Sequence, residues 1–472
     1  YIHAIAAYRK SEDYDALLRV IRDDAGILLA SLKPADVLEA LDRCPAETLK
    51  SYPFALLVLM RRMFTWRQIP KMMELKALLL SAIEEHPELS EEERGNLLGE
   101  CDLILSFLCY NDIRAMSRLH RSASRQMSRP AISIQNSGGW TFGSPSVLMM
   151  FYRAPGELAQ ELSEMDECMP HYYRITGNHG QGAETIMRAE AADMQGRFTD
   201  AQVNMGLCCD FLAWRLSLFA DMEERYSLEA RYAELLRYHD ASWINIWTST
   251  SAYYHALRGD VRQIPEIFSR HRLSDINMLA PGRPMMEMIE NQVYLAQAAY
   301  AKIIARSGEL LALCEAMHYA LVALHIRIQT AIAYEQLGKF EEAHTILTRA
   351  LADAEPDGFA MPFVENFQLL RPMLSREIVT PLIEQILALG DAATARHAAG
   401  RRPAVFEVLT EREFEIVQRM AERLSNREIA AQLFLSEGSV KQYVNQIYAK
   451  LHIEGDTRTK RAQLTKLLGQ KT

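Results

Sequence analysis

The stretch that decides the fold is Leu409–Leu464, LTEREFEIVQRMAERLSNREIAAQLFLSEGSVKQYVNQIYAKLHIEGDTRTKRAQL. It contains the start signals of three helices. Thr410 is followed three residues later by Glu413, and Ser425 is followed in the same way by Glu428, which is the pattern of a capping box. Ser436 is a plain N-cap. The stretch therefore predicts three short helices that begin close to these residues.

The apolar residues of the same stretch predict one core that the three helices share. They are Phe414, Ile416, Val417 and Met420 on the first helix, Ile429, Ala430 and Leu433 on the second, and Val440, Val444, Ile447 and Leu451 on the third. Only Phe434–Ser436 separates the second helix from the third, which we place at Glu437–Leu451. The two helices must therefore meet at a tight angle. That is helix-turn-helix geometry, in which the second helix of the pair lies in the major groove of DNA.

The outward face of the third helix carries polar side chains that suit DNA. These are Ser439, Lys441, Gln442, Asn445 and Gln446. Lysine binds guanine edges or phosphates, and glutamine and asparagine pair with adenine, while hydroxyls and amides at helix starts hold phosphates. For each residue alone, an ordinary solvated face is the alternative. The caps and the short turn together favour DNA binding.

The tail resembles the LuxR-type helix-turn-helix domain. The matching residues are Leu409-Thr410-x-Arg412-Glu413, Ser425-Asn426-x-Glu428-Ile429-Ala430, Leu433-x-Leu435-Ser436, Ser439-Val440-Lys441, Ile447 and Lys450-Leu451. The sequence departs from the family at Arg423 or Leu424, where Gly is frequent, at Tyr443, where His is common, and at Gly455–Lys460, which looks like a small insertion.

The resemblance implies a small four-helix domain over residues 405–472 with a defined set of DNA-binding residues. The set is Thr410, Ser425, Asn426, Ser436, Ser439, Val440, Lys441, Gln442, Asn445 and Lys450. By the same resemblance Lys441, Gln442 and Asn445 meet the bases, and a last helix at about Arg458–Leu468 helps the protein to dimerise.

The charge of the protein is divided unevenly along the chain. The whole sequence has a net charge of −9, but residues 405–472 hold 11 basic and 9 acidic residues and carry +2. The rest, with 41 basic and 52 acidic residues, carries −11. Non-specific DNA binding depends on attraction to phosphates, so we do not expect it from the acidic body.

The body, residues 1–390, is predicted to be helical and to contain repeated helix pairs. Residues 191–201, AADMQGRFTDA, and 333–343, AYEQLGKFEEA, share Ala, Gly, Phe and Ala at equal spacing, with looser copies at Ala7–Leu17 and Ala252–Ile264. In such a hairpin a small Ala allows close helix contact, Gly ends the first helix, and the aromatic packs into the turn. This pattern predicts a tetratricopeptide-like solenoid, an all-α fold. Unrelated hairpins with similar turns are the alternative.

The body is similar to the middle region of the large ATP-binding LuxR regulators, which include the maltose regulator. The best stretch is 327–366, with Gly338, Ala343, Ala350-Leu351, Gly358 and Pro362-Phe363. In that family an ATPase module precedes this region, but the sequence has no GxxxxGK[ST] loop. Because the sequence starts at Tyr1, we expect a fragment. We expect no cofactor in these residues, and ATP only in a module upstream.

Several segments break the helical pattern and offer candidate ligand-binding residues. Gln135–Pro145 and Gly177–Gly182 are rich in glycine, and 391–404 is predicted to be a linker. Trp140, Phe142, Trp243 and Trp247 are candidates for stacking on a small-molecule inducer, although core packing is the simpler explanation for each. His179 is expected to be a solvated loop residue, and Met285, Met286 and Met288 either fill the core or line an adaptable pocket.

Other classes of function find little support in the sequence. The seven cysteines are scattered without a CxxC pair, so we expect no disulfide framework, no metal site and a reducing cytoplasm. No apolar run is long enough for a membrane helix, and no catalytic motif stands out. The sequence predicts a transcription regulator that senses an inducer and binds double-stranded DNA as a self-associated protein. A helical scaffold for a partner protein, with DNA binding secondary, is the alternative.

Overall fold

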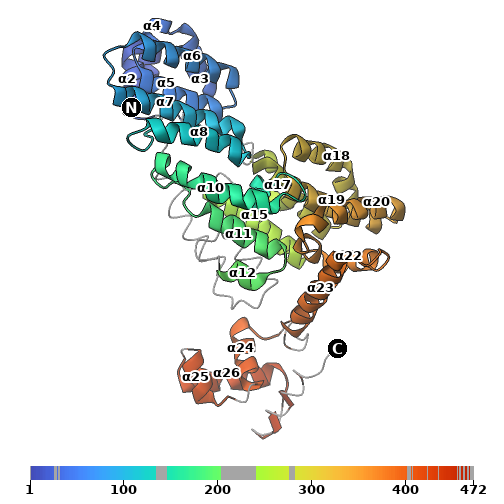
Figure 1. Ribbon diagram of the computed structural model, residues 1–472. Coiled ribbons are helices and arrows are strands. Elements are labelled where there is room, and N and C mark those ends of the chain that lie inside the picture. The colour runs from blue at the N-terminus through green and yellow to red at the C-terminus, as the bar shows by residue number, and fades with distance from the viewer. Residues whose placement is uncertain are drawn as a thin grey trace. The chain divides into compact units, whose positions relative to one another are not determined.

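The computed structural model divides the chain into two compact units, Tyr1–Gly390 and Asp391–Thr472 (Figure 1). The structure describes all residues except 1, 26–28, 30–31, 134–145, 204–240, 276–281, 401–405, 407, 422–423, 434, 454, 457–458, 461–462, 465–466 and 468–472. The described residues contain helices and no strand, which confirms the predicted all-α class. Among them, no helix is both long enough and apolar enough to cross a membrane.

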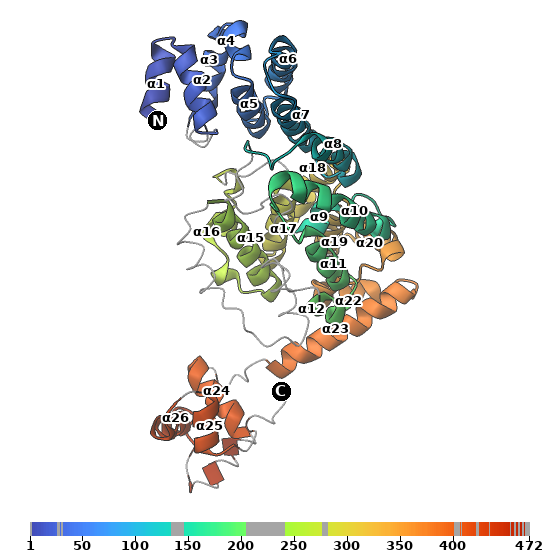
Figure 2. The same cartoon turned by 60° about the vertical axis from the view of Figure 1, so that its left-hand side comes forward.

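The first part of the larger unit is a bundle of helices that pack on their neighbours in the sequence. The helices are α1 (Ile2–Lys10), α2 (Tyr14–Asp23), α3 (Pro34–Arg43), α4 (Ala46–Lys50), α5 (Pro53–Thr65), α6 (Ile69–Glu85), α7 (Glu91–Ser106) and α8 (Ile113–Gln126). Helix α5 packs on α6, and α7 packs on α8 (Figure 2). Helix α5 lies at the centre, because residues 55–60 are all buried.

The second part of the larger unit continues the same pattern. Its helices are α9 (Val147–Phe151), α10 (Leu158–Thr176), α11 (Ala183–Met194), α12 (Phe198–Val203), α15 (Ala241–Arg258), α16 (Glu266–Ser269), α17 (Arg283–Ala296), α18 (Tyr300–Ala316), α19 (Ala320–Gln336), α20 (Phe340–Ala354), α21 (Met361–Val364), α22 (Phe367–Leu374) and α23 (Pro381–Gly400). Helix α10 packs on α8 and so connects the two parts, and α19 packs on both α18 and α20.

The two hairpins predicted most clearly from the sequence are present. Gly196 follows α11 with φ +72°, and Gly338 follows α19 with φ +73°, a conformation that glycine adopts without steric cost. The alanines that flank the turns, Ala191, Ala201, Ala333 and Ala343, are at most 1% exposed. The sequence argument therefore identified both turns and the small residues that let their helices approach. That these hairpins build a solenoid stays a prediction.

The aromatic residue of the repeat does not occupy the place that the sequence argument gave it. Phe340 is 56% exposed, with the guanidinium of Arg376 5.8 Å from the centre of its ring. Phe198 is only half-buried. The prediction that this aromatic packs into the turn is therefore wrong for Phe340. The buried alanines already bring the two helices together, and the ring at the first turn of α20 lies outside their contact.

The same turn recurs where the sequence has no glycine. Between α18 and α19, His318 has φ +54° and the amide of Tyr319 donates to the carbonyl of Cys314 at 2.8 Å. Between α17 and α18, Ala298 has φ +55° and the amide of Ala299 donates to Tyr294 at 2.8 Å. Each is a Schellman-type end, in which an amide beyond the helix bonds a carbonyl of its last turn. Glycine therefore marks only some of the hairpins.

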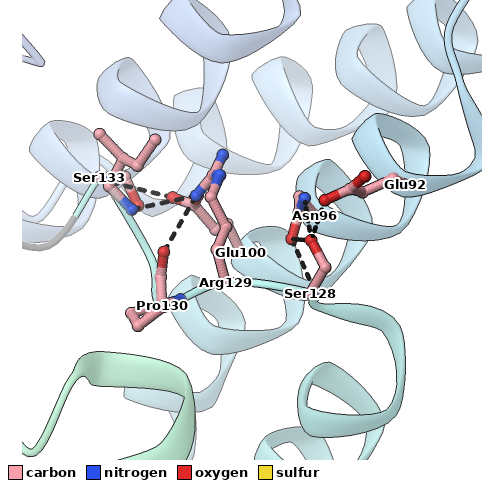
Figure 3. A network of polar contacts seen from close by, with 8 residues as sticks. Glu92, Asn96, Glu100, Ser128, Arg129, Pro130 and Ser133 are labelled. Carbon is pink, nitrogen blue, oxygen red and sulfur yellow. Dashed lines mark hydrogen bonds and ion pairs between the residues drawn. The ribbon is translucent and has the colours of Figure 1, made fainter.

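A buried carboxylate anchors the irregular segment that follows α8 (Figure 3). Glu100 of α7 is fully buried and accepts from Arg129 Nη1 at 2.8 Å and from the amides of Ile132 at 3.1 Å and Ser133 at 2.9 Å. Arg61 of α5 donates to the carbonyl of Ser133. A buried carboxylate with several donors is well satisfied, so residues 129–133 are held against α7.

The predicted linker, 391–404, begins inside a helix. Helix α23 runs from Pro381 to Gly400, and residues 391–400 form its last turns. The linker was predicted because the stretch is rich in Ala, His and Arg and is followed by Pro403, whereas alanine has the highest helix propensity of all residues. Residues 401–404 lie outside the described residues.

The smaller unit contains α24 (Glu411–Ala421), α25 (Asn426–Gln432) and α26 (Glu437–Lys450) around one core. Five of the predicted core residues are fully buried, with an exposure of 0%: Ile416, Val417, Ile429, Val440 and Ile447. The core also contains residues that the sequence argument omitted, namely Phe406, Tyr448, Ile453 and Leu464. Of the predicted last helix, the described residues at 459–460, 463–464 and 467 are helical.

One carboxylate joins the start of α24 to the end of α26. Glu413 Oε2 accepts from the amide of Thr410 at 2.7 Å, from its hydroxyl at 3.0 Å and from Lys450 Nζ at 2.7 Å. Burial raises the pKa of Glu413, but the hydrogen bonds from Lys450 and Thr410 outweigh it and leave the pKa below its ordinary value. A group whose pKa is lowered by folding stabilises the fold above its unfolded pKa, and this contribution is lost as the pH falls.

We predict that Gly390→Ala destabilises the larger unit and that Gly308→Ala does not. A Cβ at Gly390 of α23 would lie 2.3 Å from ring atoms of Phe367, which is 4% exposed, so the core must shift at a cost of about 1–3 kcal/mol. A Cβ at Gly308 of α18 meets nothing within 4 Å, and alanine there improves helix propensity by up to ~1 kcal/mol. Urea unfolding of the two variants should shift the midpoint in opposite directions. Equal shifts would contradict the packing of α23 on Phe367.

We predict that Glu413→Ala loosens the smaller unit more than Glu428→Ala. Both remove the acidic arm of a capping box, worth about 1 kcal/mol, but only the first also removes the buried partner of Lys450. Hydrogen exchange of the full chain should show faster exchange in α24 and α26 for Glu413→Ala. The difference between wild type and this variant should shrink as the pH falls towards 4. Equal effects of the two substitutions would show that the ion pair adds nothing.

Candidate nucleic-acid interface

Helix α26 begins at the residue predicted from the sequence, Glu437. Ser436 is the N-cap, and its hydroxyl accepts from the amide of Ser439 at 3.0 Å. The helix ends at Lys450, one residue before the predicted end, because Leu451 is the C-cap and bonds back to the carbonyl of Ile447. The first helix of the pair, α25, begins in the same way after the N-cap Ser425, whose hydroxyl accepts from the amide of Glu428.

The predicted base-reading residues lie together on the exposed side of α26. Lys441, Gln442 and Asn445 are exposed, as is Gln446. Residues three and four positions apart lie on the same face of an α-helix, so these four side chains form one polar surface. Opposite them, Val440, Val444 and Ile447 fix the helix to the core. The geometry therefore presents a lysine and three carboxamides to solvent on a helix whose rotation is set by packing.

Val440 does not lie on this surface. Its side chain is 0% exposed and belongs to the core of the smaller unit. The prediction that Val440 contacts DNA is therefore wrong for its side chain. The residue matches the family pattern because it holds the helix in place, a role that a motif match alone does not separate from binding.

Lys450 and Thr410 act on the placement of the helices. The ammonium of Lys450 is bonded to Glu413, whose side chain is 3% exposed, while 40% of the lysine side chain remains exposed. Thr410 donates to the same carboxylate. Both side chains are thus bonded to Glu413 within the domain, so the structure does not present either of them as an unpaired donor for DNA.

The remaining predicted residues are cap residues at the two helix starts. Ser425 donates to Glu428 at 2.7 Å, and the hydroxyls of Ser436 and Ser439 are 2.8 Å apart. Asn426, at the start of α25, is half-buried. These side chains satisfy helix ends first, which fixes where the backbone amides at each start point.

Arg412 has a role that the sequence argument did not assign. Its Nη2 donates to the carbonyl of Leu433 at 2.6 Å, and its Nη1 donates to Glu415 at 2.7 Å. The arginine on α24 thereby holds the end of α25, at the turn that leads into α26. It matched the family pattern, but a long-range bond to a backbone carbonyl leaves no signal in residue spacing.

The structure gives little support to the candidate ligand-binding residues of the body. Trp140 and Phe142 lie outside the described residues, as does the side chain of Trp243, and Trp247 is half-buried on α15. Met285, Met286 and Met288 are at most 4% exposed, which supports the core-filling interpretation.

His179 is not the solvated loop residue that was expected. It is half-buried, and its Nδ1 lies 2.9 Å from the hydroxyl of Tyr172, a residue 6% exposed. Burial lowers the pKa of His179. The dense glycines on either side suggested a solvated loop, but they let the chain turn so that the imidazole lies beside Tyr172 of α10.

The described residues contain no group of three or more His, Cys, Asp or Glu side chains that could hold a metal ion. Cys44, Cys101 and Cys314 are free and buried. Burial raises the pKa of Cys101 to about 11. These thiols are therefore protonated at neutral pH and have little nucleophilic character.

Comparison with known proteins assigns the smaller unit. Residues 407–461 match the model of the GerE family, described as bacterial regulatory proteins of the luxR family. The chain is similar to the nitrate/nitrite response regulator protein NarP of Escherichia coli (strain K12), with 30% identity over 108 residues, 22% of this chain and 47% of NarP. It is also similar to the transcriptional regulatory protein LnrK of Bacillus subtilis (strain 168), with 42% identity over 50 residues, 11% of this chain and 23% of LnrK. No solved structure matches the chain.

The alignments therefore span less than half of either relative. Within the matched range, the two capping boxes, the short turn and the exposed face of α26 reproduce a helix-turn-helix. Residues 407–461 therefore form a helix-turn-helix domain that matches the luxR family of bacterial regulatory proteins, and this part of the chain is similar to transcription regulators.

Proposed function

We propose that the protein regulates transcription in response to a small molecule, with the helical body as the sensor and α26 as the helix that enters the major groove of its operator. The observation that carries the DNA-binding half is the exposed face of Lys441, Gln442 and Asn445 on a helix fixed by its cap and core. Lysine donates to guanine, and carboxamides pair with adenine in bidentate fashion. The three side chains suit a short mixed sequence.

The charge of the tail supports binding by more than one copy. Residues 405–472 carry only +2, and two of their cations, Lys450 and Arg412, are already paired with Glu413 and Glu415. Phosphate neutralisation supplies much of the affinity of a DNA-binding protein. One tail therefore gains little from it, and two tails on a two-fold operator gain twice as much.

The body is proposed to bind and sense instead of catalysing a reaction. We expect no enzymatic activity of this chain, because no catalytic motif stands out in its sequence. The alternative is a helical scaffold that binds a partner protein. The exposed Leu337 and Phe340 at the turn between α19 and α20 are the feature that favours it. Exposed apolar side chains that lie close together mark interaction surfaces.

We predict that the double substitution Lys441→Ala with Asn445→Ala abolishes specific operator binding. Each base contact of this kind is worth about 1–3 kcal/mol, so the pair should cost at least about 30-fold in affinity. The operator is found by selection from random duplexes, and affinity is measured by fluorescence anisotropy at fixed salt. Gln418→Ala, which removes an exposed carboxamide from α24, is the matched control and should bind as wild type does.

Circular dichroism should show that both proteins keep their helices. Unchanged operator affinity in the double variant would remove α26 from the major groove. If Lys441 contacts a phosphate, its substitution alone should also reduce the salt dependence of binding by about one unit in the log–log slope.

We predict that the small molecule sensed by the body raises the melting temperature of the full chain, because a ligand that binds only the folded state stabilises it. Differential scanning fluorimetry against a metabolite library tests this. A hit that also changes operator affinity supports the sensor. A library without hits, together with a partner protein that binds wild type but not Phe340→Ser, would favour the scaffold.

A further inference from the structure

The first three helices of the chain enclose an apolar cavity of about 60 Å³ that is partly open to solvent. It is lined by Leu18 and Ile21 of α2, by Val37 and Leu41 of α3, and by Ile5 of α1. Each of these side chains is at most 7% exposed. The cavity thus lies within the core of the N-terminal bundle.

The size of the cavity suits a short branched alkyl group. A site needs about 10–15 Å³ of such volume for each water-sized group, so this one takes about four or five. Nearly all of its lining is apolar, and an apolar cavity of this kind stays dry and takes up hydrocarbon instead. Burying a methylene group from water contributes about 0.8 kcal/mol. An alkyl group of about four carbons therefore has a strong preference for this space.

Two opposite charges stand at the lining of the cavity. Arg9 Nη1, in the last turn of α1, lies 2.7 Å from Asp36 Oδ1, in the first turn of α3. Their side chains are 29% and 42% exposed, which places the pair where the cavity meets solvent. An ion pair this exposed contributes at most about 1 kcal/mol. A ligand that offers the opposite charges to each partner can therefore replace it at little cost.

The lining has two further polar groups, the hydroxyl of Tyr14 and the thiol of Cys44, and neither adds a charge. Burial raises the pKa of the Cys44 thiol to about 11, so the thiol is neutral at pH 7 and is a poor nucleophile. It neither captures a ligand covalently nor adds a charge to the apolar end of the cavity. Recognition at this site rests on the alkyl space and the two charges.

We propose that the cavity binds a free zwitterionic α-amino acid with a branched apolar side chain, such as leucine or isoleucine. The side chain fills the cavity, the carboxylate accepts from the guanidinium of Arg9, and the ammonium donates to Asp36. An α-amino acid carries both charges on one carbon, which matches two opposite charges side by side at one mouth. Guanidinium binds carboxylate through two parallel hydrogen bonds. This site does not depend on the DNA-binding function proposed above.

Isothermal titration of the full chain with L-leucine and L-isoleucine tests the proposal. Both should bind, and two probes that each lack one element should bind at least tenfold more weakly. L-Alanine keeps both charges without the branched side chain, and 3-methylbutan-1-ol keeps the branched group without the charges. Absence of leucine binding overturns the proposal. Equal binding of alanine overturns the role of the cavity, and equal binding of the alcohol overturns the role of the charges.

Three variants locate the site. Ala40→Leu fills the cavity and should abolish leucine binding, whereas Ala35→Leu, on the exposed side of the same helix, should leave it intact. Arg9→Gln removes the guanidinium that is proposed to bind the carboxylate of the ligand, and it should weaken leucine binding at least tenfold. This variant tests the site even where circular dichroism shows that Ala40→Leu is unstable. Leucine affinity unchanged in Arg9→Gln overturns the proposal. Operator binding of the same preparations, measured in parallel, separates failure of this site from failure of the DNA-binding function.

Discussion

The DNA-binding unit depends on a single buried carboxylate. Glu413 closes the capping box of α24 and accepts the ammonium of Lys450 at the far end of α26. The first helix leaves amides without partners at its start, as every helix does, and here their acceptor also holds the recognition helix. The start of one helix and the end of another are thereby set by the same oxygen atom, Glu413 Oε2. Arg412 adds the second link, from α24 to the carbonyl of Leu433, the C-cap of α25.

This arrangement explains which parts of the interface could be predicted from the sequence. Caps are local, since a hydroxyl and a carboxylate three residues apart leave a pattern in the chain, and the starts at Thr410, Ser425 and Ser436 were all identified. The apolar spacing likewise placed Val440 and Ile447 inward. The bonds of Lys450 and Arg412 join residues 37 and 21 positions apart. No local pattern encodes such a pair, so Lys450 was assigned to DNA by family likeness alone.

In the body, too, the sequence reveals only part of the structure. Its hairpins share one turn geometry, in which the residue after the helix has positive φ and the amide beyond it bonds backwards. Gly196 and Gly338 reveal two of these turns in the sequence, whereas Ala298 and His318 adopt the same backbone without any compositional signal. Holding a non-glycine residue in this region costs about 1–2 kcal/mol, which the packing of the adjacent helices offsets. A search for repeats based on glycine therefore finds only part of the pattern.

Some basic side chains of the smaller unit are paired within the domain and others are exposed, and this division bears on the proposed recognition of DNA. Lys450 and Arg412 hold the fold, so the basic side chains that α25 and α26 expose are chiefly Arg427 and Lys441. With so little phosphate attraction from one tail, discrimination between sequences falls to the carboxamides of Gln442 and Asn445. Contacts of this kind are specific but individually weak. Under the proposed function, such a domain binds tightly only when two copies are held at the spacing of one operator. A signal that changes the association of the body would then change the occupancy of DNA without altering α26 itself.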